Sequence, residues 1–306
     1  MTDILIGIDG GASKTHLLAA DTKLNIKTEL TGSGCNYLAI GLSCAVDNLS
    51  GLIQKAVNSI HQDGYSYYVT IGTAGAGRKD DIERLTVSLK ESLKNMDIPC
   101  KEIMFMSDAV IALEGAFEGK VGVILNCGTG SFVFGKDKEG NIHRAGGFGR
   151  LIGDEGSGYS IGRKGITLIS KMMDDRISES EFYNAFIETT GITNGAELIN
   201  NIYKLDFEIP SVAPLVISCA DNDKLCRDIL DEEVDELILH LEAIKNKMKT
   251  DDFNLVLMGS LINEENYYST GLRAKIKEYL PEVKIIEPVK IPAYGALLFS
   301  QKMPGN

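Results

Sequence analysis

The 306-residue sequence has no tryptophan and only four histidines, which lie far apart. None of its six cysteines forms a C-x-x-C pair, so neither a zinc site nor a disulfide framework is indicated, and reduced thiols are the simpler interpretation. After Met1-Thr2-Asp3 the chain enters an apolar run with no basic segment before it. No apolar stretch approaches the ~20 residues that cross a bilayer. We therefore expect a cytoplasmic protein without a secretory signal or a membrane partner.

The sequence also has fewer basic than acidic residues. Lysine and arginine number 31 against 43 aspartate and glutamate residues, which gives a formal net charge of −12 and a sequence pI near 4.9. A general nucleic-acid-binding protein needs a basic face to displace counterions, so we expect no nucleic acid partner. With 44% hydrophobic residues, a chain of this length can bury a sizeable core and form two domains.

The order of apolar runs and turns indicates an α/β protein. Three short strands, at 4–9, 15–21 and 26–30, predict an antiparallel meander. Helices and strands then alternate in the following segments: helix 41–62, strand 67–71, helix 82–93, strand 103–106 and helix 108–117. The meander with its alternating elements predicts one compact unit of about 115 residues.

The same order begins again further along the chain. A strand at 121–126 is followed by a glycine turn at 128–131 and a returning strand at 132–135, about 118 residues after the first such arrangement. Helices dominate 157–249, and the chain closes with a strand at 255–258, a strand at 283–286 and a helix at 293–301. The sequence therefore predicts two units of similar architecture, without a repeat of residue identities.

The first of the two glycine turns is a candidate phosphate-binding turn. It runs Asp9-Gly10-Gly11-Ala12-Ser13-Lys14-Thr15. It is not a Walker A loop, because Ile8 and Ser13 occupy positions that require glycine and a strand follows instead of a helix. In a hairpin, the glycines let a phosphate approach the backbone, Ser13 and Thr15 offer donors, and Asp9 can hold Mg²⁺ through water. An ordinary tight hairpin fits the same residues.

The second turn contains Gly128, Thr129 and Gly130 between two strands. One such turn is common in proteins. Two of them, each opening an α/β unit, predict two halves that hold the phosphate chain of one nucleotide from opposite sides.

Acidic residues provide two further candidates. Asp108 follows a strand and begins a helix, where it is either a helix cap or a general base for a sugar hydroxyl. The rest of phosphoryl transfer is positioning and charge neutralisation. The segment 146–158 has six glycines in thirteen residues, so it is neither helix nor regular strand. Because it also holds Phe148 and Asp154, a functional loop is favoured over a merely solvated one.

Three smaller glycine-containing segments are compatible with the edge of a cleft or with plain turns. They are 34–37, 72–77 and 259–260.

Together these motifs resemble the BadF/BadG/BcrA/BcrD ATPase family, within it the N-acetylglucosamine kinase branch with its bacterial hexosamine and murein sugar kinases. The most specific part is Gly-Asp-Glu-Gly-Ser-Gly at 153–158, with Gly-Gly-Phe-Gly at 146–149 before it. The resemblance implies an actin/hexokinase-like α/β fold of two ribonuclease H-like domains with an interdomain cleft. The first would be 1–117 completed by the helix 293–306, and the second 118–292 with helical insertions.

The resemblance also implies roles for individual residues and the cofactors ATP and Mg²⁺. Asp108 would be the catalytic base and Asp9 would hold Mg²⁺ through water. ATP would contact Gly10, Gly11, Ala12, Ser13, Lys14, Thr15, Gly128, Thr129 and Gly130, with Gly259 and Ser260 on the adenosine side. The sugar would contact Asn36, Thr73, Asp108, Gly146, Gly147, Phe148 and Asp154.

The implied activity is phosphorylation of the 6-hydroxyl of an amino sugar in cell-wall sugar salvage, by a homodimer. N-acetylglucosamine is the first candidate, with N-acetylmuramic acid and glucosamine as others. Animal N-acetylglucosamine kinases carry tryptophan where this chain has Phe148, which leaves the hexosamine open. N-acetylmuramic acid has a lactyl carboxylate that would need a cation, and Arg78 and Arg150 are candidates.

Two other functions fit parts of the sequence. The family includes ATPase activators of 2-hydroxyacyl-CoA dehydratases, which carry an iron–sulfur cluster at a dimer interface. Cys127 lies beside the second turn, but no suitably placed second cysteine accompanies it. A non-catalytic, actin-like ATP-binding regulator would need neither Asp108 nor the loop around Asp154.

Overall fold

The contacts within the chain divide it into two compact units. The computed structural model describes residues 2–60, 64–75 and 79–303. Unit 1 comprises Met1–Val121 and Glu287–Asn306, and unit 2 comprises Gly122–Ile286. Each unit holds one five-stranded sheet with helices. The α/β class expected from the sequence is therefore confirmed, while the ribonuclease H-like character of each unit stays a prediction.

The sheet of unit 1 has the strand order β3-β2-β1-β4-β5. The strands are β1 (Thr2–Gly10), β2 (Lys14–Asp21), β3 (Ile26–Ser33), β4 (Tyr65–Thr73) and β5 (Cys100–Ser107). Strands β1, β2 and β3 pair antiparallel, which confirms the predicted meander, and β4 and β5 continue parallel to β1.

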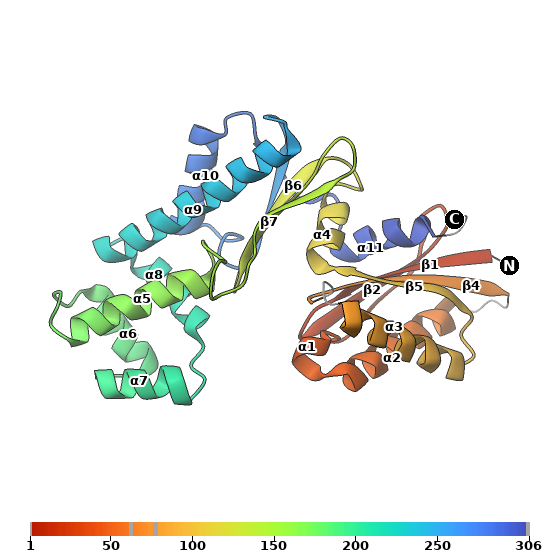
Figure 1. Ribbon diagram of the computed structural model, residues 1–306, viewed down its shortest axis with the longest axis horizontal. Helices are drawn as coiled ribbons and strands as arrows, with labels where there is room; N and C mark the ends of the chain where they lie inside the picture. The colour runs from red at the N-terminus through yellow and green to blue at the C-terminus, as the bar shows by residue number, and fades with distance from the viewer. Residues whose placement is uncertain (1, 61–63, 76–78, 304–306) are drawn as a thin grey trace. The chain divides into compact units, whose positions relative to one another are not determined.

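Helices cover both faces of this sheet. They are α1 (Tyr37–Ile40), α2 (Leu42–Ile60), α3 (Lys79–Asn95), α4 (Asp108–Ala116) and α11 (Pro292–Gln301). Helices α2 and α3 lie on one face, and α4 and α11 lie on the other (Figure 1). Because successive side chains of a strand point to opposite faces, Ile4 and Ile6 pack with the α2–α3 layer whereas Leu5 packs with α11.

The end of the chain completes unit 1. Helix α11 packs directly on the backbone of β1, since a Cβ atom on Gly7 would lie 2.3 Å from the carbonyl oxygen of Ala293. The Ser300 hydroxyl donates to the Ile6 carbonyl at 2.9 Å and lies 2.9 Å from the Thr70 hydroxyl. The strand β1 and the helix α11 therefore belong to one core although almost the whole chain separates them.

The sheet of unit 2 repeats the pattern in the order β10-β9-β6-β7-β8. Its strands are β6 (Gly122–Cys127), β7 (Ser131–Lys136), β8 (Ile142–Gly146), β9 (Asn254–Met258) and β10 (Lys284–Ile285). Strands β6, β7 and β8 pair antiparallel, and β9 runs parallel to β6.

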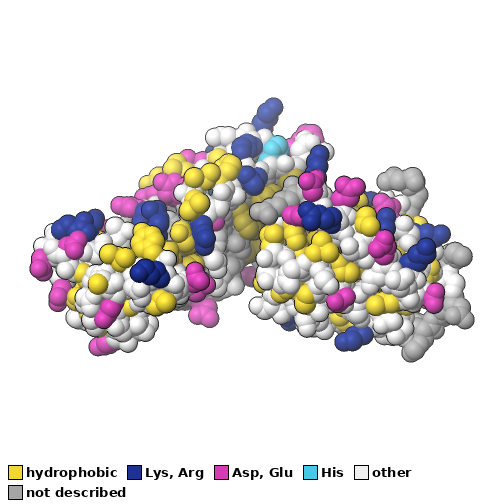
Figure 2. Space-filling view, turned by 60° about the horizontal axis from the view of Figure 1, so that its bottom comes forward, with side chains coloured by type: hydrophobic (Ala, Val, Ile, Leu, Met, Phe, Trp, Pro, Cys, Tyr) yellow, Lys and Arg dark blue, Asp and Glu magenta, His cyan; other side chains and the backbone are white. Residues whose placement is uncertain are grey.

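Helices dominate the rest of unit 2, as the sequence predicts. They are α5 (Gly158–Met173), α6 (Glu181–Thr190), α7 (Gly195–Lys204), the 3₁₀ helix η1 (Ile209–Val212), α8 (Ala213–Cys219), α9 (Lys224–Met248) and α10 (Tyr267–Tyr279). Helix α9 packs on β7 and β8, and α10 packs on α9. Among the residues described, no helix has both the length and the apolar character that a membrane crossing requires. On the face drawn in Figure 2, acidic and basic side chains are interspersed.

Candidate functional site

In unit 1, the carboxyl ends of three parallel strands bring predicted site residues to one edge of the sheet. Gly10 of β1 pairs with Thr73 of β4, and Thr73 pairs with Ser107 of β5. Asp9 and Asp108 therefore lie at the same edge, from segments about a hundred residues apart. Ligands of open α/β sheets bind at this kind of edge.

The first glycine turn lies at this edge and is braced from one side. The Gly11 N–H donates to the Lys14 carbonyl at 3.0 Å, and the exposed turn carries Ser13 at its tip. The N–H groups of Cys35 and Asn36 donate to the Gly11 carbonyl at 3.1 and 3.2 Å. These contacts fix the backbone of the turn while leaving its outer surface accessible.

Thr15 and Thr73 are placed differently from the exposed turn residues. Each side chain is 1% exposed. The Thr15 hydroxyl donates to the Ser33 carbonyl at 2.7 Å, so it is directed toward β3 and not toward the surface of the turn. Among the turn residues, Ser13 and the backbone are better placed to meet a phosphate than the Thr15 hydroxyl is.

The surroundings of Asp9 disfavour the ionised form of its carboxyl group and raise its pKa. Burial raises its pKa, the negative charge of Asp108 raises it further, and His16 partly opposes the shift. Two carboxylates that repel each other at a strand end are suited to a divalent cation. In the described parts of the chain no cluster of three or more His, Cys, Asp and Glu side chains could hold a metal. A cation at Asp9 would therefore keep most of its ligands as water or phosphate oxygens, as Mg²⁺ does.

Asp108 is the first residue of α4, and its side chain is oriented by its neighbours. Its Oδ1 accepts hydrogen bonds from the Ala109 N–H at 2.8 Å and from the Ser107 hydroxyl at 3.2 Å. In the described part of the chain, no hydrogen bond occupies Oδ2. The carboxylate is thus held through one oxygen at the start of α4, and its other oxygen makes no hydrogen bond among the described residues.

Asn36 is the N-cap of α1. Its side-chain carbonyl accepts the Leu38 N–H at 3.0 Å, and among the described residues the amide NH₂ makes no hydrogen bond. The neighbouring Tyr37 hydroxyl donates to the Gly75 carbonyl at 3.0 Å. Arg78, a predicted candidate for a substrate carboxylate, lies outside the described residues.

In unit 2, the second glycine turn is docked on the start of α5. The Gly128 N–H donates to the Gly130 carbonyl at 3.0 Å, and the Gly158 N–H donates to the Gly128 carbonyl at 2.8 Å. Gly259 packs against the same turn with a φ of 109°, and a Cβ there would lie 2.2 Å from the Cys127 carbonyl oxygen. The structure therefore brings the turn and the Gly259–Ser260 segment together.

Asp154 also contacts this turn. Its Oδ1 accepts the Gly149 N–H at 3.0 Å, and a Cβ on Gly130 would lie 2.8 Å from its Oδ2. Burial raises the pKa of Asp154 and the charge of Glu155 adds to the rise, while the bond from Gly149 opposes it. The carboxylate predicted to bind sugar is thus adjacent to the turn predicted to bind phosphate.

The rest of the glycine-rich segment differs in exposure. Gly146 and Gly147 both have positive φ, 65° and 69°, and Gly146 lies over the ring of His240. Phe148 is 63% exposed, with the Arg144 guanidinium 4.8 Å from its ring centre. The Phe148 ring is therefore available to stack on a ligand.

A cavity of roughly 690 Å³ adjoins these residues within unit 2. Thr129, Gly130 and Asp154 form one part of its wall, and the segment 202–210 contributes another. Arg150 also lines it, with its guanidinium 5.7 Å from the centre of the Tyr159 ring. The volume is in the range of small-molecule sites.

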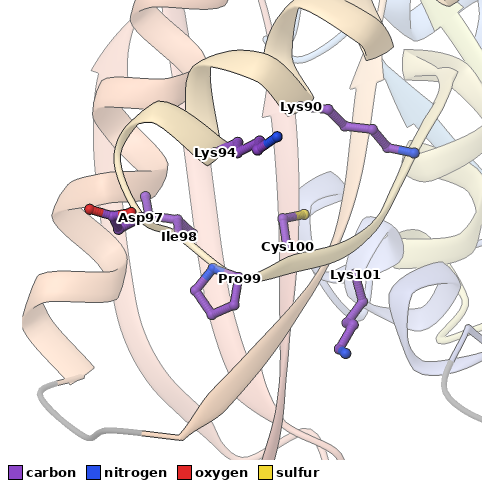
Figure 3. Close-up of a pocket in the computed structure, with 7 residues that line it drawn as sticks. All are labelled: Lys90, Lys94, Asp97, Ile98, Pro99, Cys100 and Lys101. Carbon is purple, nitrogen blue, oxygen red and sulfur yellow. The ribbon is translucent and has the colours of Figure 1, made fainter.

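A second hollow lies elsewhere and does not belong to this site. Lys90, Lys94 and Lys101 surround Cys100 at the start of β5, the end of the strand opposite Asp108 (Figure 3). The side chains of Lys90 and Lys101 extend in different directions in Figure 3, so they do not converge on one ligand.

The residues that bind Gly156, near the end of the glycine-rich loop, were not identified from the sequence. The Cys127 thiol and the Tyr268 hydroxyl each donate to the Gly156 carbonyl at 2.7 Å, and Glu233 accepts the Gly156 N–H. Burial is the main reason that the pKa of Cys127 rises to about 12. One feature of the sequence could have drawn attention to them: the acidic residue Glu233 occupies a core position of the long amphipathic helix α9.

Two named sugar kinases are similar to this chain along nearly its whole length. An N-acetylmuramic acid/N-acetylglucosamine kinase of Clostridium acetobutylicum is 32% identical over 304 residues, covering 97% of this chain and 98% of that protein. An N-acetyl-D-glucosamine kinase of Dictyostelium discoideum is 28% identical over 312 residues, with 97% and 98% covered.

Solved structures share the fold. A Chromobacterium violaceum protein, described provisionally as an N-acetylglucosamine kinase, aligns with a TM-score of 0.71 at 20% identity, covering 97% of this chain and 98% of that one. A ROK family glucokinase from Streptomyces griseus aligns with a TM-score of 0.54 at 14% identity, covering 96% and 97%. The fold is thus the two-domain α/β fold of the actin/hexokinase-like class. Because the family model matches residues 6–300, this chain belongs to the BadF/BadG/BcrA/BcrD ATPase family, whose use of ATP it shares.

Proposed function

We propose that this protein is an ATP-dependent sugar kinase that phosphorylates the 6-hydroxyl of an amino sugar. N-acetylglucosamine is the first candidate acceptor, and N-acetylmuramic acid and glucosamine are the others. Two relatives with kinase names, each aligned over 97% of the chain, support the sugar class. The observation that carries the proposal is Asp108, which stands beside Asp9 with one carboxylate oxygen fixed and the other open.

In unit 1, Asp108 is the general base of the proposed reaction. Its Oδ2 accepts the proton of the sugar hydroxyl as that oxygen attacks the γ-phosphorus of ATP, and ADP leaves. The Ala109 N–H holds Oδ1 and so fixes the direction in which Oδ2 points. A base positioned in this way is typically worth ~10²–10⁴-fold in rate. The amide of Asn36 and the turn containing Ser13 supply donors to the sugar and to the phosphates.

Magnesium fits the same edge of the sheet. Asp9 would hold the ion through water, because burial and the negative charge of Asp108 both destabilise its carboxylate anion. When bound, the ion supplies positive charge to the phosphate oxygens. Its charge would oppose the rise in the pKa of Asp9, which burial causes first and the charge of Asp108 second.

In unit 2, the turn 128–130 binds phosphate through its backbone, and Gly259 and Ser260 lie on the adenosine side. Asp154 accepts hydrogen bonds from the sugar next to that turn. Phe148 presents an exposed ring for stacking.

Replacing the base tests the mechanism. We expect Asp108→Asn to lower kcat for N-acetylglucosamine by ~10²–10⁴-fold with little change in the Kd of the sugar, because the amide keeps the shape but cannot take a proton. The matched control is Asp80→Asn, an exposed aspartate in the first turn of α3 in the same unit. Coupled ADP release and sugar titration measure the two quantities. An unchanged kcat in Asp108→Asn would exclude this mechanism.

A sugar panel tests the acceptor. We propose that Arg150, at the wall of the unit 2 cavity, contacts the lactyl carboxylate of N-acetylmuramic acid. Arg150→Ala should then lower kcat/KM for N-acetylmuramic acid by roughly 10-fold or more relative to N-acetylglucosamine, the size expected for a lost charge-assisted bond. Arg144→Ala is the control, since Arg144 also stacks on a ring of this segment. Equal ratios in both variants would remove the assignment of Arg150.

The two other functions gain no support from the site. Cys127, which suggested an iron–sulfur activator, is fully buried and donates its thiol hydrogen to Gly156. Purified protein that contains iron and absorbs visible light would reinstate that activator. A non-catalytic regulator would hydrolyse or bind ATP with no dependence on amino sugars, which the same ADP-release assay detects. A homodimer stays a prediction, and light scattering distinguishes it from the 33.2 kDa monomer.

A further inference from the structure

We infer that one face of helix α9, formed by Glu233, Leu237 and His240, positions the glycine-rich loop 146–156, with Glu233 as its principal positioning residue. The inference rests on the proposed function only in that Asp154 of this loop binds the sugar. None of the three α9 residues belongs to the predicted site.

The three residues share one face because they are four and three positions apart on a helix. Each lies against a glycine of the loop. Glu233 Oε2 accepts the N–H of Gly156, and a Cβ on Gly156 would lie 2.3 Å from Leu237 Cδ2. A Cβ on Gly146 would lie 2.9 Å from His240 Cε1. Helix α9 therefore contacts the loop at both of its ends.

His240 adds a second link to the acidic part of the loop. Its Nε2 lies 3.5 Å from Glu155 Oε2, and its side chain is 14% exposed. The loop thus contacts α9 through Gly146, Glu155 and Gly156, which flank Asp154.

Gly156 is the most constrained point of the loop. Its N–H is bound by Glu233, and its carbonyl accepts from Cys127 Sγ and from the Tyr268 hydroxyl, each at 2.7 Å. Its φ of 80° is a conformation that glycine adopts without strain, and Leu237 leaves no room for a Cβ. Because Gly156 is held at both its N–H and its carbonyl, the two peptide groups that flank it are fixed, and Asp154, two residues earlier, has little freedom to move.

Glu233 is unusual for a residue on a buried helix face, being 1% exposed. Its Oε1 accepts the Ser160 hydroxyl at 2.7 Å and lies 3.0 Å from Lys164 Nζ. Burial opposes the charge of Lys164, but Glu232 and Glu233 outweigh it and raise the lysine pKa. A buried ion pair is weak evidence for a stabilising role, because an apolar residue can often replace it. Its bond to Gly156 instead links Glu233 to the loop that presents Asp154.

The test compares Glu233→Ala and Glu233→Gln with Glu232→Ala. Glu232 also binds Lys164, at 2.8 Å, but among the described residues it makes no hydrogen bond or ion pair with the loop. Its side chain is 68% exposed, so it is a matched control. We expect Glu233→Ala to raise the KM for the amino sugar by about 10- to 100-fold, the scale of a misplaced binding group. Glu233→Gln should recover part of this loss, since its amide oxygen can still accept the Gly156 N–H. Glu232→Ala should stay near the wild type.

A measurement without turnover separates positioning from general stability. Amide hydrogen exchange of peptides covering 146–157 should rise in Glu233→Ala, while exchange in β6, β7 and α10 stays unchanged. Tyr268→Phe, which removes one of the two donors to the Gly156 carbonyl, should give a smaller rise in the same peptides. This second variant keeps the test decisive if Glu233→Ala does not fold.

Each outcome bears on one claim. If Glu233→Ala matches Glu232→Ala in sugar KM and in loop exchange, the positioning role is wrong while the kinase proposal stands. If exchange rises evenly through unit 2, Glu233 is only structural and the inference is also wrong. If the wild type phosphorylates no amino sugar, the proposed function fails, and the exchange comparison still decides whether Glu233 holds the loop.

Discussion

Asp9 illustrates how a residue that we propose to serve the reaction can be costly to the fold. Its folded pKa is raised above the ordinary value of 3.8 by burial and by Asp108. The native state therefore binds the Asp9 proton more tightly than the unfolded chain does. Stability contributed by this group is present below the unfolded pKa, falls as the pH rises through the folded pKa, and stays lost at neutral pH.

Replacing Asp9 should accordingly stabilise the protein without its ligands. We expect Asp9→Asn to have a higher Tm than the wild type at pH 7 in the absence of Mg²⁺, and the difference should shrink toward pH 4. Activity should fall at the same time. Thermal unfolding across this pH range, with Asp80→Asn as an exposed control, measures the effect. A difference in Tm that does not depend on pH would contradict the assigned cause.

The exposure of the cysteine side chains leads to a second prediction at the level of residues. Cys44 is exposed, whereas Cys35, Cys127, Cys219 and Cys226 are buried. Burial raises the pKa of Cys100 to about 11, mainly through desolvation, and that of Cys127 to about 12. Since the thiolate is the reactive form, N-ethylmaleimide should label Cys44 first in native protein at pH 7.5.

Peptide mass spectrometry identifies the labelled cysteine, and Cys44→Ser is the control that should remove the fast phase. Rapid labelling of Cys127 in folded protein would show that the environment of Gly156 is open, contrary to its burial.

At the level of elements, helices α4 and α11 pack so closely that replacing a glycine in α11 by alanine should be destabilising, contrary to the usual effect in a helix. Replacing glycine by alanine inside a helix usually stabilises it by ~1 kcal/mol. In α11, however, a Cβ on Gly295 would lie 1.9 Å from the Ile111 carbonyl oxygen. The two backbones pack too closely for a side chain at this position.

We therefore expect Gly295→Ala to lower the free energy of unfolding by roughly 1–3 kcal/mol, the usual cost of overpacking. Gly51→Ala, in α2 of the same unit, has nothing within 4 Å of its Cβ and should be neutral or stabilising. Denaturant titration of both variants decides the matter. Equal effects of the two substitutions would mean that α11 can shift away from α4 at little cost.

At the level of the whole molecule, unit 1 depends on both ends of the chain. Leu5 and Leu18 form one apolar cluster with Ala293 and Leu297. A chain that ends at Ile286 would expose this cluster and leave the Ile6 carbonyl without Ser300.

We expect the truncated chain to lose the cooperative unfolding transition of unit 1 and to aggregate, because several fully buried side chains become exposed. Circular dichroism melts and solubility measure this, with Lys302→Ala in the full chain as a control. A soluble truncated protein with the transition intact would show that α11 is dispensable for the core.

Much of the fold was predictable because local patterns carry it. Apolar runs identified β1, β2 and β3 in unit 1 and β6 and β7 in unit 2, but not β8, and spacings of three and four identified α2 and α3. The two glycine turns were predicted from the glycine, serine and threonine residues of the turns themselves. The contacts with Gly156 were not predictable, because Cys127, Glu233 and Tyr268 come from a strand and two different helices. Glu233 was noticeable as an acidic residue at a core position of α9, but no local sequence indicates that the three residues share a partner.

Sequence alone determined the α/β class, the two glycine turns, the family resemblance and the candidates Asp9, Asp108 and Asp154, since each depends on residues close together in the chain. Only the tertiary structure decided that Asp9 and Asp108 meet at one strand edge, that Asp154 touches Gly130, and that α9 supports the loop. These relations come from strand register and helix packing, which join distant segments and which no local pattern specifies.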